Sequence, residues 1–435
     1  MNTHSPTPTP AHAPDPSPAA APPATGAPWT CPFCSLLCDG FDLQDGDPPR
    51  LIGSDCPRAL KALAAFSRTA TPVTPSIDGA PATLEAALDA AAARLSGARQ
   101  PLFGGLATDV AGMRQLYRLA NTCGAILDHA HGEALMHTLR PLQDRGQMFT
   151  TLAEIRTRAD LVVCFGTDAT NYPEFFRRCA PATGSGVHRR TVFVGAVPPA
   201  QAIESSSVDI VAGQGDLFDT AATLAALVEQ RGLPQPAAEL AELADALRAA
   251  RYAVLVWEPA QLPAHGALIG EALLRMVMSL NRSTRAGMFA LGGLDGAQTA
   301  NAAMTWLSGL PLRSRVGPRG LEHQPLQYAT DRLLAGDEVD LLLWVASFGP
   351  NLPPPPTGVP RIVLGHPALA APCAEKGTIF IPVATPGVNA SGHLLRADSV
   401  VALPLHAIRD DGLPGVADVA RALDARLALV AEGAR

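Results

Sequence analysis

Short hydrophobic runs alternate with amphipathic segments along the chain from about residue 83 onward. The runs are continuous and are not interrupted by polar residues, which is typical of strands buried on both faces of a sheet. They predict strands at 101–106, 125–128, 160–166, 191–195, 253–257, 340–345 and 361–364. The amphipathic segments predict helices at 84–95, 110–123, 216–231, 238–250, 265–280, 298–307 and 323–335. Because strands that alternate with helices form parallel sheets, we expect an α/β fold with two doubly wound parallel sheets.

The first 75 residues follow a different pattern. Residues 1–28 are rich in Pro, Ala, Thr and Ser without periodicity, so we expect a disordered tail. Residues 29–75 predict a small cysteine-bearing β unit, with strands at 40–43 and 50–53 and then a helix capped by Ser54 or Asp55, with Pro57 in its first turn. Residues 76–435 would then form the α/β region, with two or more interleaved doubly wound subdomains.

Composition excludes several classes of protein. The net charge is −7, only 17% of the residues are charged, and no basic run occurs, which argues against a nucleic-acid partner. No apolar run is long enough for a membrane span. No Lys or Arg precedes Arg50, which argues against secretory and mitochondrial signals, so we expect a cytoplasmic protein. The small share of charged residues favours a surface partly covered by other subunits.

Half of the eight cysteines gather near the N-terminus. Cys31, Cys34 and Cys38 have C-x2-C-x3-C spacing, and Cys56 follows. Thiolates at such spacing can converge on an iron–sulfur cluster or on zinc. The uneven spacing favours a [4Fe–4S] cluster, because structural zinc usually takes two separated C-x2-C pairs. These four are the candidate metal ligands, and the alternatives are zinc and four thiols that only pack. The other cysteines are predicted to be small buried hydrophobes: Cys123, Cys164, Cys179 and Cys373.

Two further segments carry candidate chemistry. His129, His131 and His137 lie within nine residues together with Glu133. Such a group could bind a divalent metal, or it could be a polar loop that lines a cavity. The loop at 166–171 follows a predicted strand, where doubly wound sheets bind phosphates or nucleotides. No G-x-G-x-x-G or P-loop sequence is present, so nicotinamide and ATP roles lose support.

Three segments resemble one superfamily. The cysteine spacing resembles the N-terminal cluster site of molybdopterin and tungstopterin oxidoreductases, as do the loop at 159–168 and the stretch at 380–398. More narrowly, residues 31–39 are similar to the B subunit of formylmethanofuran dehydrogenase, and this resemblance extends over most of 29–405. It implies a molybdopterin-oxidoreductase-like fold.

The resemblance also implies an assembly. In bacteria this type of subunit is part of the formyltransferase/hydrolase complex of tetrahydromethanopterin-linked oxidation of formaldehyde to formate. The implied partners are a formyltransferase, an amidohydrolase-like subunit and a small β-helix-type subunit, together with a methanofuran-type carrier. The chain would scaffold these subunits or bind the carrier.

One departure from the family bears on activity. Redox members bind tungsten or molybdenum through a cysteine or selenocysteine in a loop after a short strand, but residues 126–137 contain no cysteine and Ala134 stands near the expected ligand. Alanine supplies no soft ligand, so we expect that the tungsto- or molybdopterin has been lost. One alternative is a redox-active formylmethanofuran dehydrogenase subunit that carries a [4Fe–4S] cluster and binds the metal through a displaced ligand, such as His131 or His137. The other is a stand-alone protein of this fold that binds a cluster or zinc.

Overall fold

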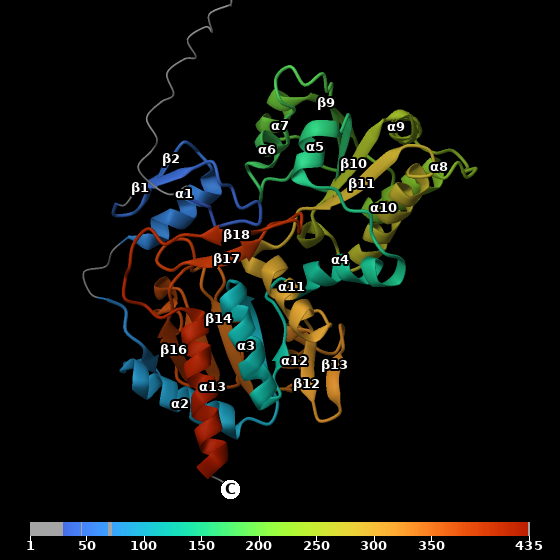
Figure 1. The fold of residues 1–435 in the computed structure, drawn as a ribbon. Helices are drawn as coiled ribbons and strands as arrows, with labels where there is room; N and C mark the ends of the chain where they lie inside the picture. The colour runs from blue at the N-terminus through green and yellow to red at the C-terminus, as the bar shows by residue number, and fades with distance from the viewer. Residues whose placement is uncertain (1–28, 45, 68–71, 434–435) are drawn as a thin grey trace, which may run out of the picture.

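The computed structural model describes residues 29–44, 46–67 and 72–433. The tail predicted to be disordered, 1–28, lies outside the described residues. The described part contains two lobes, each built on one large sheet, and a small N-terminal unit beside them (Figure 1). No helix of this part combines the length and the apolar character that crossing a membrane requires.

The larger lobe is built on a nine-stranded sheet with the order β13-β12-β6-β5-β14-β15-β16-β3-β4. Its central strands, from β6 to β16, run parallel, and antiparallel strands complete both edges. The strands are β3 (Ser76–Ile77), β4 (Ala80–Pro81), β5 (Pro101–Ala107), β6 (Ile126–Leu127), β12 (Ser314–Gly317), β13 (Gly320–His323), β14 (Leu341–Ala346), β15 (Arg361–Gly365) and β16 (Thr378–Pro382).

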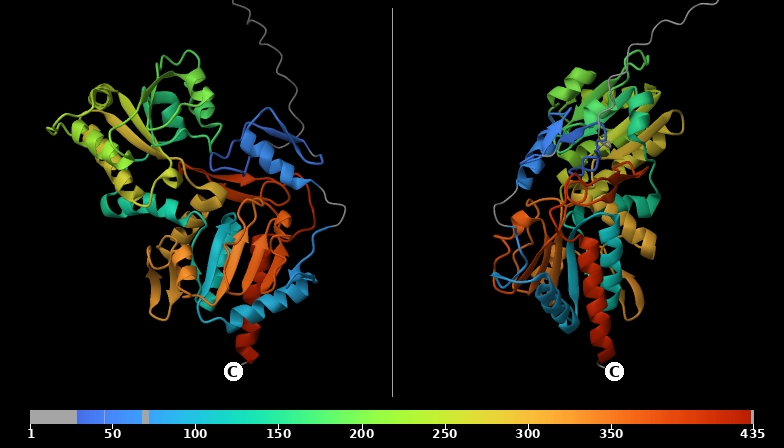
Figure 2. Two further views of the ribbon diagram at one scale, coloured as in Figure 1. Left: turned by 180° about the vertical axis from the view of Figure 1, so that it is seen from behind. Right: turned by 60° about the vertical axis from the view of Figure 1, so that its left-hand side comes forward.

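Both faces of this sheet are buried. On β14, Leu343 and Val345 enter one core and Leu342 and Trp344 enter the other, because successive side chains point to opposite faces. The first face packs against α2 (Leu84–Gly97), α3 (Val110–Cys123), α11 (Ala297–Ser308) and α13 (Val416–Gly433). The second face, seen from behind in Figure 2, packs against α12 (Thr330–Ala335), η4 (Pro367–Leu369) and connecting loops. This two-sided burial explains the continuous hydrophobic runs.

The smaller lobe is built on a fully parallel sheet with the order β11-β10-β7-β8-β9, and its strands come from a segment between β6 and β12. The strands are β7 (Leu161–Phe165), β8 (Arg190–Val194), β9 (Ser207–Val211), β10 (Tyr252–Trp257) and β11 (Arg285–Ala290). One face packs on α8 (Leu217–Val228), α9 (Ala238–Ala249) and α10 (Gly266–Leu280). The other face packs on α5 (Leu152–Arg158), α6 (Phe175–Cys179) and α7 (Ala200–Ser205). The expectation of two doubly wound sheets is confirmed.

The remaining elements lie outside the two large sheets and the helices listed above. The N-terminal unit contains the hairpin of β1 (Asp42–Gln44) and β2 (Arg50–Ile52), followed by α1 (Pro57–Leu63) and η1 (Ala64–Phe66). Its core is continuous with the α6 face of the five-stranded sheet, so the boundary at residue 75 stays a prediction. The remaining elements are α4 (Gly132–Arg145), η2 (Pro259–Gln261), η3 (Leu294–Gly296), β17 (Gly392–Leu395) and β18 (Ala402–Leu405).

Two local predictions are wrong. The helix predicted at 323–335 begins only at Thr330, because His323 is the last residue of the β12–β13 hairpin and residues 324–329 form a turn. Residue Cys56 occupies the N-cap of α1, not Ser54 or Asp55. The Ser54 hydroxyl instead accepts the backbone N–H of Cys56 at 3.1 Å, which forms a turn before the helix. Pro57 opens the helix as predicted.

Candidate functional site

The first three candidate cysteines lie in one tight loop. The backbone N–H of Cys31 donates to the carbonyl of Cys38 at 2.9 Å, and that of Leu37 donates to the carbonyl of Cys34 at 3.2 Å. Cys56 joins them in the same buried core, and all four residues are at most 8% exposed. The fold therefore brings together the four cysteines that the spacing singled out.

Their surroundings favour the neutral thiol. Burial and the neighbouring thiols raise the pKa of Cys31 well above its ordinary value. Burial raises the pKa of Cys34 to about 11 and that of Cys38 to about 12, although Arg58 and Arg178 respectively oppose these shifts. Burial also raises the pKa of Cys56. As they stand, the four side chains pack as protonated thiols at neutral pH.

The donor set suits an iron–sulfur cluster in its chemistry. Four thiols in an apolar shell, with the guanidinium groups of Arg58 and Arg178 beside them, would favour an anionic [4Fe–4S] centre. Among the residues that the structure describes, however, no three His, Cys, Asp or Glu side chains are placed so that they could hold a metal ion. A cluster would need deprotonated thiols turned toward one centre.

The histidine segment makes a different set of contacts. His129 is 1% exposed; its Nδ1 accepts the backbone N–H of His131 at 3.0 Å, so the proton lies on Nε2, 3.2 Å from the carbonyl oxygen of Asp295. The ring of His131 stacks on that of His129, and its Nε2 lies 2.9 Å from Oδ2 of Asp295. Burial lowers the pKa of His129 to about 3. Both histidines are thus held by Asp295.

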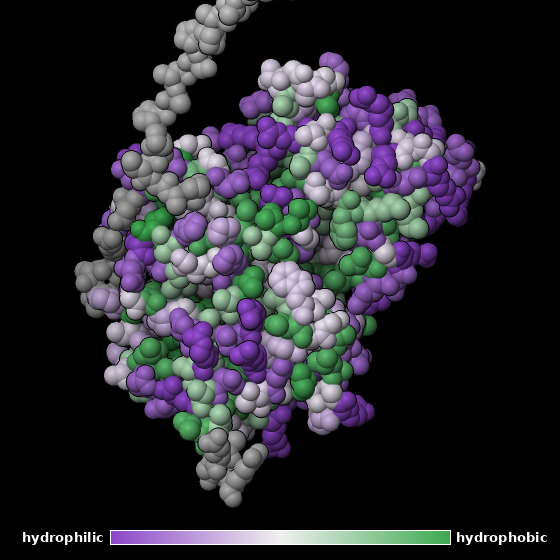
Figure 3. Space-filling view, in the orientation of Figure 1, coloured by the Kyte–Doolittle hydropathy of each residue, from purple (hydrophilic) through white to green (hydrophobic). Residues whose placement is uncertain are grey.

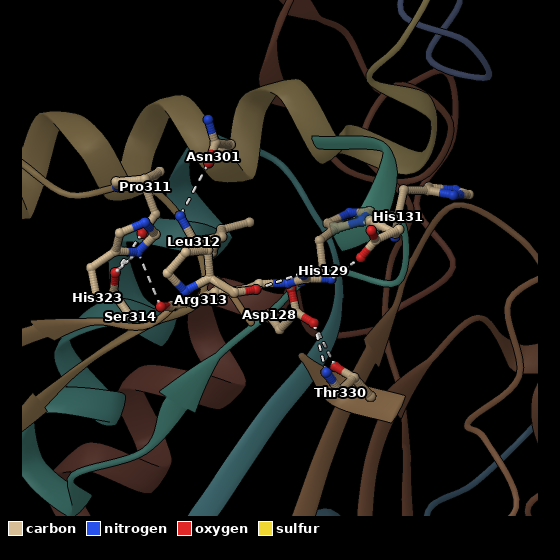
Figure 4. A network of polar contacts seen from close by, with 12 residues as sticks. Asp128, His129, His131, Asn301, Pro311, Leu312, Arg313, Ser314, His323 and Thr330 are labelled. Atoms are coloured by element: carbon tan, nitrogen blue, oxygen red, sulfur yellow. Dashed lines mark hydrogen bonds and ion pairs between the residues drawn. The ribbon is translucent and has the colours of Figure 1, made fainter. Parts of the chain in front are cut away.

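Asp128 anchors the same segment from below (Figure 4). Its Oδ1 lies 3.3 Å from Nε of Arg313, and its Oδ2 accepts the backbone N–H and the hydroxyl of Thr330, both at 2.9 Å. The Arg313 side chain also donates to the carbonyl of Pro325 at 2.7 Å and to Glu133 at 3.1 Å. Because the side chains of Asp128 and Arg313 are 2% and 4% exposed, this ion pair fixes the end of β6 within the core.

His137 lies one turn into α4 and does not join the other two histidines. Its Nδ1 lies 3.0 Å from the carbonyl oxygen of Pro259, and its Nε2 lies 3.6 Å from Glu133. The segment 129–137 is therefore a hydrogen-bonded loop and helix start, and one side of it faces a cavity.

This cavity, here called the α4 cavity, has a volume of about 210 Å³. Ala134 and His131 of the histidine segment line it, together with Met288 of β11, Asn301 of α11 and Asp398. Hydrophobic residues gather on the surface where the two lobes meet (Figure 3). The methyl group of Ala134 lines the cavity and offers no metal ligand.

A second cavity, the α1 cavity, has a volume of about 290 Å³ and lies at the carboxyl ends of β5 and β14. Arg58 and Lys61 contribute its positive side chains, and Asp295 its carboxylate. Doubly wound sheets bind ligands at this edge of their strands.

The loop at 166–171 is occupied by internal contacts. The Thr167 hydroxyl and the Asn171 amide donate to the buried carboxylate of Glu258, at 2.8 and 2.7 Å. Asp168 accepts the backbone N–H and the hydroxyl of Thr170, at 2.9 and 2.8 Å. These side chains stabilise the loop, and a ligand would have to displace them.

Sequence reasoning missed Asp295, which joins the two histidines. The signal was its setting between Gly293 and Gly296 in a glycine-rich loop. Asp295 itself has φ +52°, a left-handed conformation that Asp and Asn adopt more readily than other non-glycine residues. No sequence signal identified Arg313 as the partner of Asp128.

The sequence is similar to those of two other proteins. It is 32% identical over 325 residues, 73% of this chain and 87% of the relative, to the B subunit of the formyltransferase/hydrolase complex Fhc of Methylorubrum extorquens. It is 25% identical over 411 residues, 85% of this chain and 91% of the relative, to the B subunit of the tungsten-containing formylmethanofuran dehydrogenase 2 of Methanocaldococcus jannaschii. No protein-family model matches the chain.

Two solved structures share the fold. One is the FhcABCD formyltransferase/hydrolase complex of Methylorubrum extorquens with methylofuran; its matching chain gives a TM-score of 0.73 at 28% identity, covering 83% of this chain and 100% of that one. The other is acetylene hydratase from Pelobacter acetylenicus, with a TM-score of 0.63 at 11% identity, covering 93% of this chain and 69% of that one. At that identity the second match shows the fold alone, and it agrees with the expected molybdopterin-oxidoreductase-like architecture.

Proposed function

The chain belongs to the family of B subunits of formyltransferase/hydrolase complexes, and on that premise we propose that it is a non-redox component of such a complex. It would hold the formyltransferase, amidohydrolase-like and small β-helix-type subunits together and take up part of a methanofuran-type carrier. The complex would serve tetrahydromethanopterin-linked conversion of formaldehyde to formate. The formyl transfer and the hydrolysis would take place on the other subunits.

The observation that carries this proposal is the wall of the α4 cavity. Ala134 lines it where redox members are expected to have a cysteine, and His131, the nearest alternative ligand, is bound to Asp295 at 2.9 Å. Tungsten or molybdenum held by a pterin needs a soft ligand from the protein. The described lining of this cavity contains no cysteine, and the sulfur of Met288, its one soft atom, accepts the side-chain amide of Gln147 at 3.8 Å, so these residues do not fit that metal.

The same cavity is the proposed place for the carrier. A volume of about 210 Å³ with mixed apolar and polar walls suits a short section of a long ligand, with the rest outside. Gln298 and Asn301 offer hydrogen bonds along one wall, and Leu139 and Met288 offer apolar contact.

The central experiment is copurification. A tagged chain expressed in its native host should return formyltransferase and amidohydrolase-like subunits in fixed ratios, and elemental analysis of that complex should find neither tungsten nor molybdenum. Recovery of the chain alone would refute the assembly. Stoichiometric metal with formate oxidation would instead favour the redox-active alternative.

Carrier binding has a separate test. In Ala134→Cys, a small maleimide should label the new thiol from the α4 cavity, and saturating carrier should slow that labelling. A matched variant, Ala335→Cys, places a thiol at an exposed position outside this cavity, and its labelling should not respond to the carrier. Equal labelling of Ala134→Cys with and without carrier would refute this placement.

For the four N-terminal cysteines we propose a [4Fe–4S] cluster bound by Cys31, Cys34, Cys38 and Cys56. Support comes from the loop that holds the first three, the buried core that Cys56 shares with them, and the two neighbouring arginines. We propose the cytoplasm as the compartment, since all eight cysteines are free thiols, which is typical of reducing surroundings.

A further inference from the structure

A third cavity shares no lining residue with the two cavities described above. It has a volume of about 500 Å³, beyond the carboxyl ends of β15 and β16. Phe66 of η1, Val73 and Leu413 give it mostly apolar walls, and Arg409 and His366 add polar groups. Its size and position, at the edge where doubly wound sheets bind ligands, suit a small molecule.

Arg409 is the unusual residue of this cavity. Its side chain is only 7% exposed. Nε donates to Asp411 at 2.9 Å and Nη2 donates to the carbonyl of Phe66 at 2.8 Å, but the buried Nη1 has no hydrogen-bond partner among the described residues. A buried guanidinium nitrogen without an acceptor is costly, so this donor is expected to have a partner that a protein chain alone does not supply.

His366 provides a second donor. Its Nδ1 accepts the backbone N–H of Ala368 at 3.1 Å, so the neutral ring carries its proton on Nε2. Burial and the charge of Arg409 lower the pKa of His366 to about 4, so the ring stays neutral at physiological pH. Phe66 meets this ring edge-on, with the centroids 4.8 Å apart, and holds its orientation.

The acidic group of the cavity is already engaged. Asp411 Oδ2 accepts Nε of Arg409 and the side-chain amide of Asn389, both at 2.9 Å. The cavity therefore combines two donors that lack acceptors with one satisfied carboxylate. A ligand that bears a single negative charge fits this balance better than a dianion, which Asp411 would repel.

We propose that this cavity is a binding site for a small organic monocarboxylate. The Arg409 side chain turns on binding so that Nη1, which the protein covers in the unliganded chain, donates to one carboxylate oxygen. The other oxygen accepts from Nε2 of His366, and the apolar body of the ligand lies against Phe66 and Leu413. The site is independent of the α4 cavity, so neither proposal depends on the other.

Ligand-observed NMR on the purified complex tests this site with benzoate as the probe. Benzoate should bind the wild type, and both Arg409→Met and Ala371→Trp should weaken that binding by about 10-fold or more. The first variant removes the donor. The second fills the cavity from an exposed position and so protects the test against a folding failure. Arg421→Met, an exposed arginine on α13, should leave benzoate binding unchanged.

Two further probes decide the chemical class. Benzyl alcohol should bind at least about 10-fold more weakly than benzoate because it lacks the charge, and inorganic phosphate should not displace benzoate. Absence of benzoate binding, binding that survives Ala371→Trp, or equal binding of the alcohol or of phosphate would overturn the proposal.

Discussion

His131 and Asp295 are joined by a contact of 2.9 Å between Nε2 and Oδ2, and each residue lines a different cavity. His131 lies in the wall of the α4 cavity and Asp295 in the wall of the α1 cavity. The pair therefore forms part of the partition between them. The contact with Asp295 also engages the imidazole of His131, which would be the nearest substitute for the missing cysteine ligand.

Asp295→Asn should destabilise the protein by about 1–2 kcal/mol, because the carboxylate, whose side chain is only 28% exposed, accepts from His131. Despite burial, the contact with His131 holds the pKa of Asp295 below its ordinary value of 3.8. Its stabilising effect is therefore present above pH 3.8 and is lost as the pH falls through the lower pKa of the folded state. Urea denaturation at pH 7 measures the change.

The matched control is Asp337→Asn. Asp337 also has a left-handed φ, +50°, but it is exposed. Its substitution should change the free energy of unfolding by less than about 0.5 kcal/mol. Equal effects of the two substitutions would mean that backbone conformation, not the contact with His131, explains the result.

His129 should make the protein sensitive to mild acid. Its pKa is lowered to about 3 by burial, whereas the unfolded chain takes up the proton near 6.5. Stability should therefore fall as the pH drops from about 6.5 toward 3, by up to about 1.4 kcal/mol per pH unit from this group. His129→Gln should flatten the dependence of the melting temperature on pH. An unchanged slope would contradict the prediction, and His188→Gln, at an exposed position, serves as the control.

Arg313→Met should cost about 3–5 kcal/mol, because it leaves the buried charge of Asp128 without its cation. Arg332→Met removes an arginine that is 50% exposed and paired with Glu338, and should cost no more than about 1 kcal/mol. Urea denaturation of both variants gives the comparison. Similar losses in the two would show that burial does not distinguish these ion pairs.

Anaerobically purified wild-type complex should contain about four irons per copy of this chain. Cys34→Ala should lose them, together with the charge-transfer absorption of the cluster. Cys373→Ala, which removes a buried thiol from a different core, should keep them. Iron-free wild type, with Cys34→Ala as stable as Cys373→Ala, would mean that the four thiols only pack.

The sequence by itself determined most of the parallel strands and the grouping of the cysteines. Strand β14 was predictable because an unbroken run such as Leu341–Ala346 has few alternatives to a strand buried on both faces. β9 and β11 were missed, since Asp209 and Arg285 place charge in strands whose pairing is decided by neighbours far along the chain. The helix predicted at 323–335 also took in His323, which pairs with Ser314 in the β12–β13 hairpin, and the turn that follows it.

Only the tertiary structure decided what the candidate residues contact. Spacing brought Cys31, Cys34 and Cys38 together because they belong to one loop, and local geometry depends on neighbours in sequence. Asp295 meets His131 across 164 residues, and Asp128 meets Arg313 across 185. Such contacts arise when two sheets and the loops at their edges pack, so no local pattern carries them. The chain encodes its elements locally, and the chemistry of its cavities arises from residues that folding brings together.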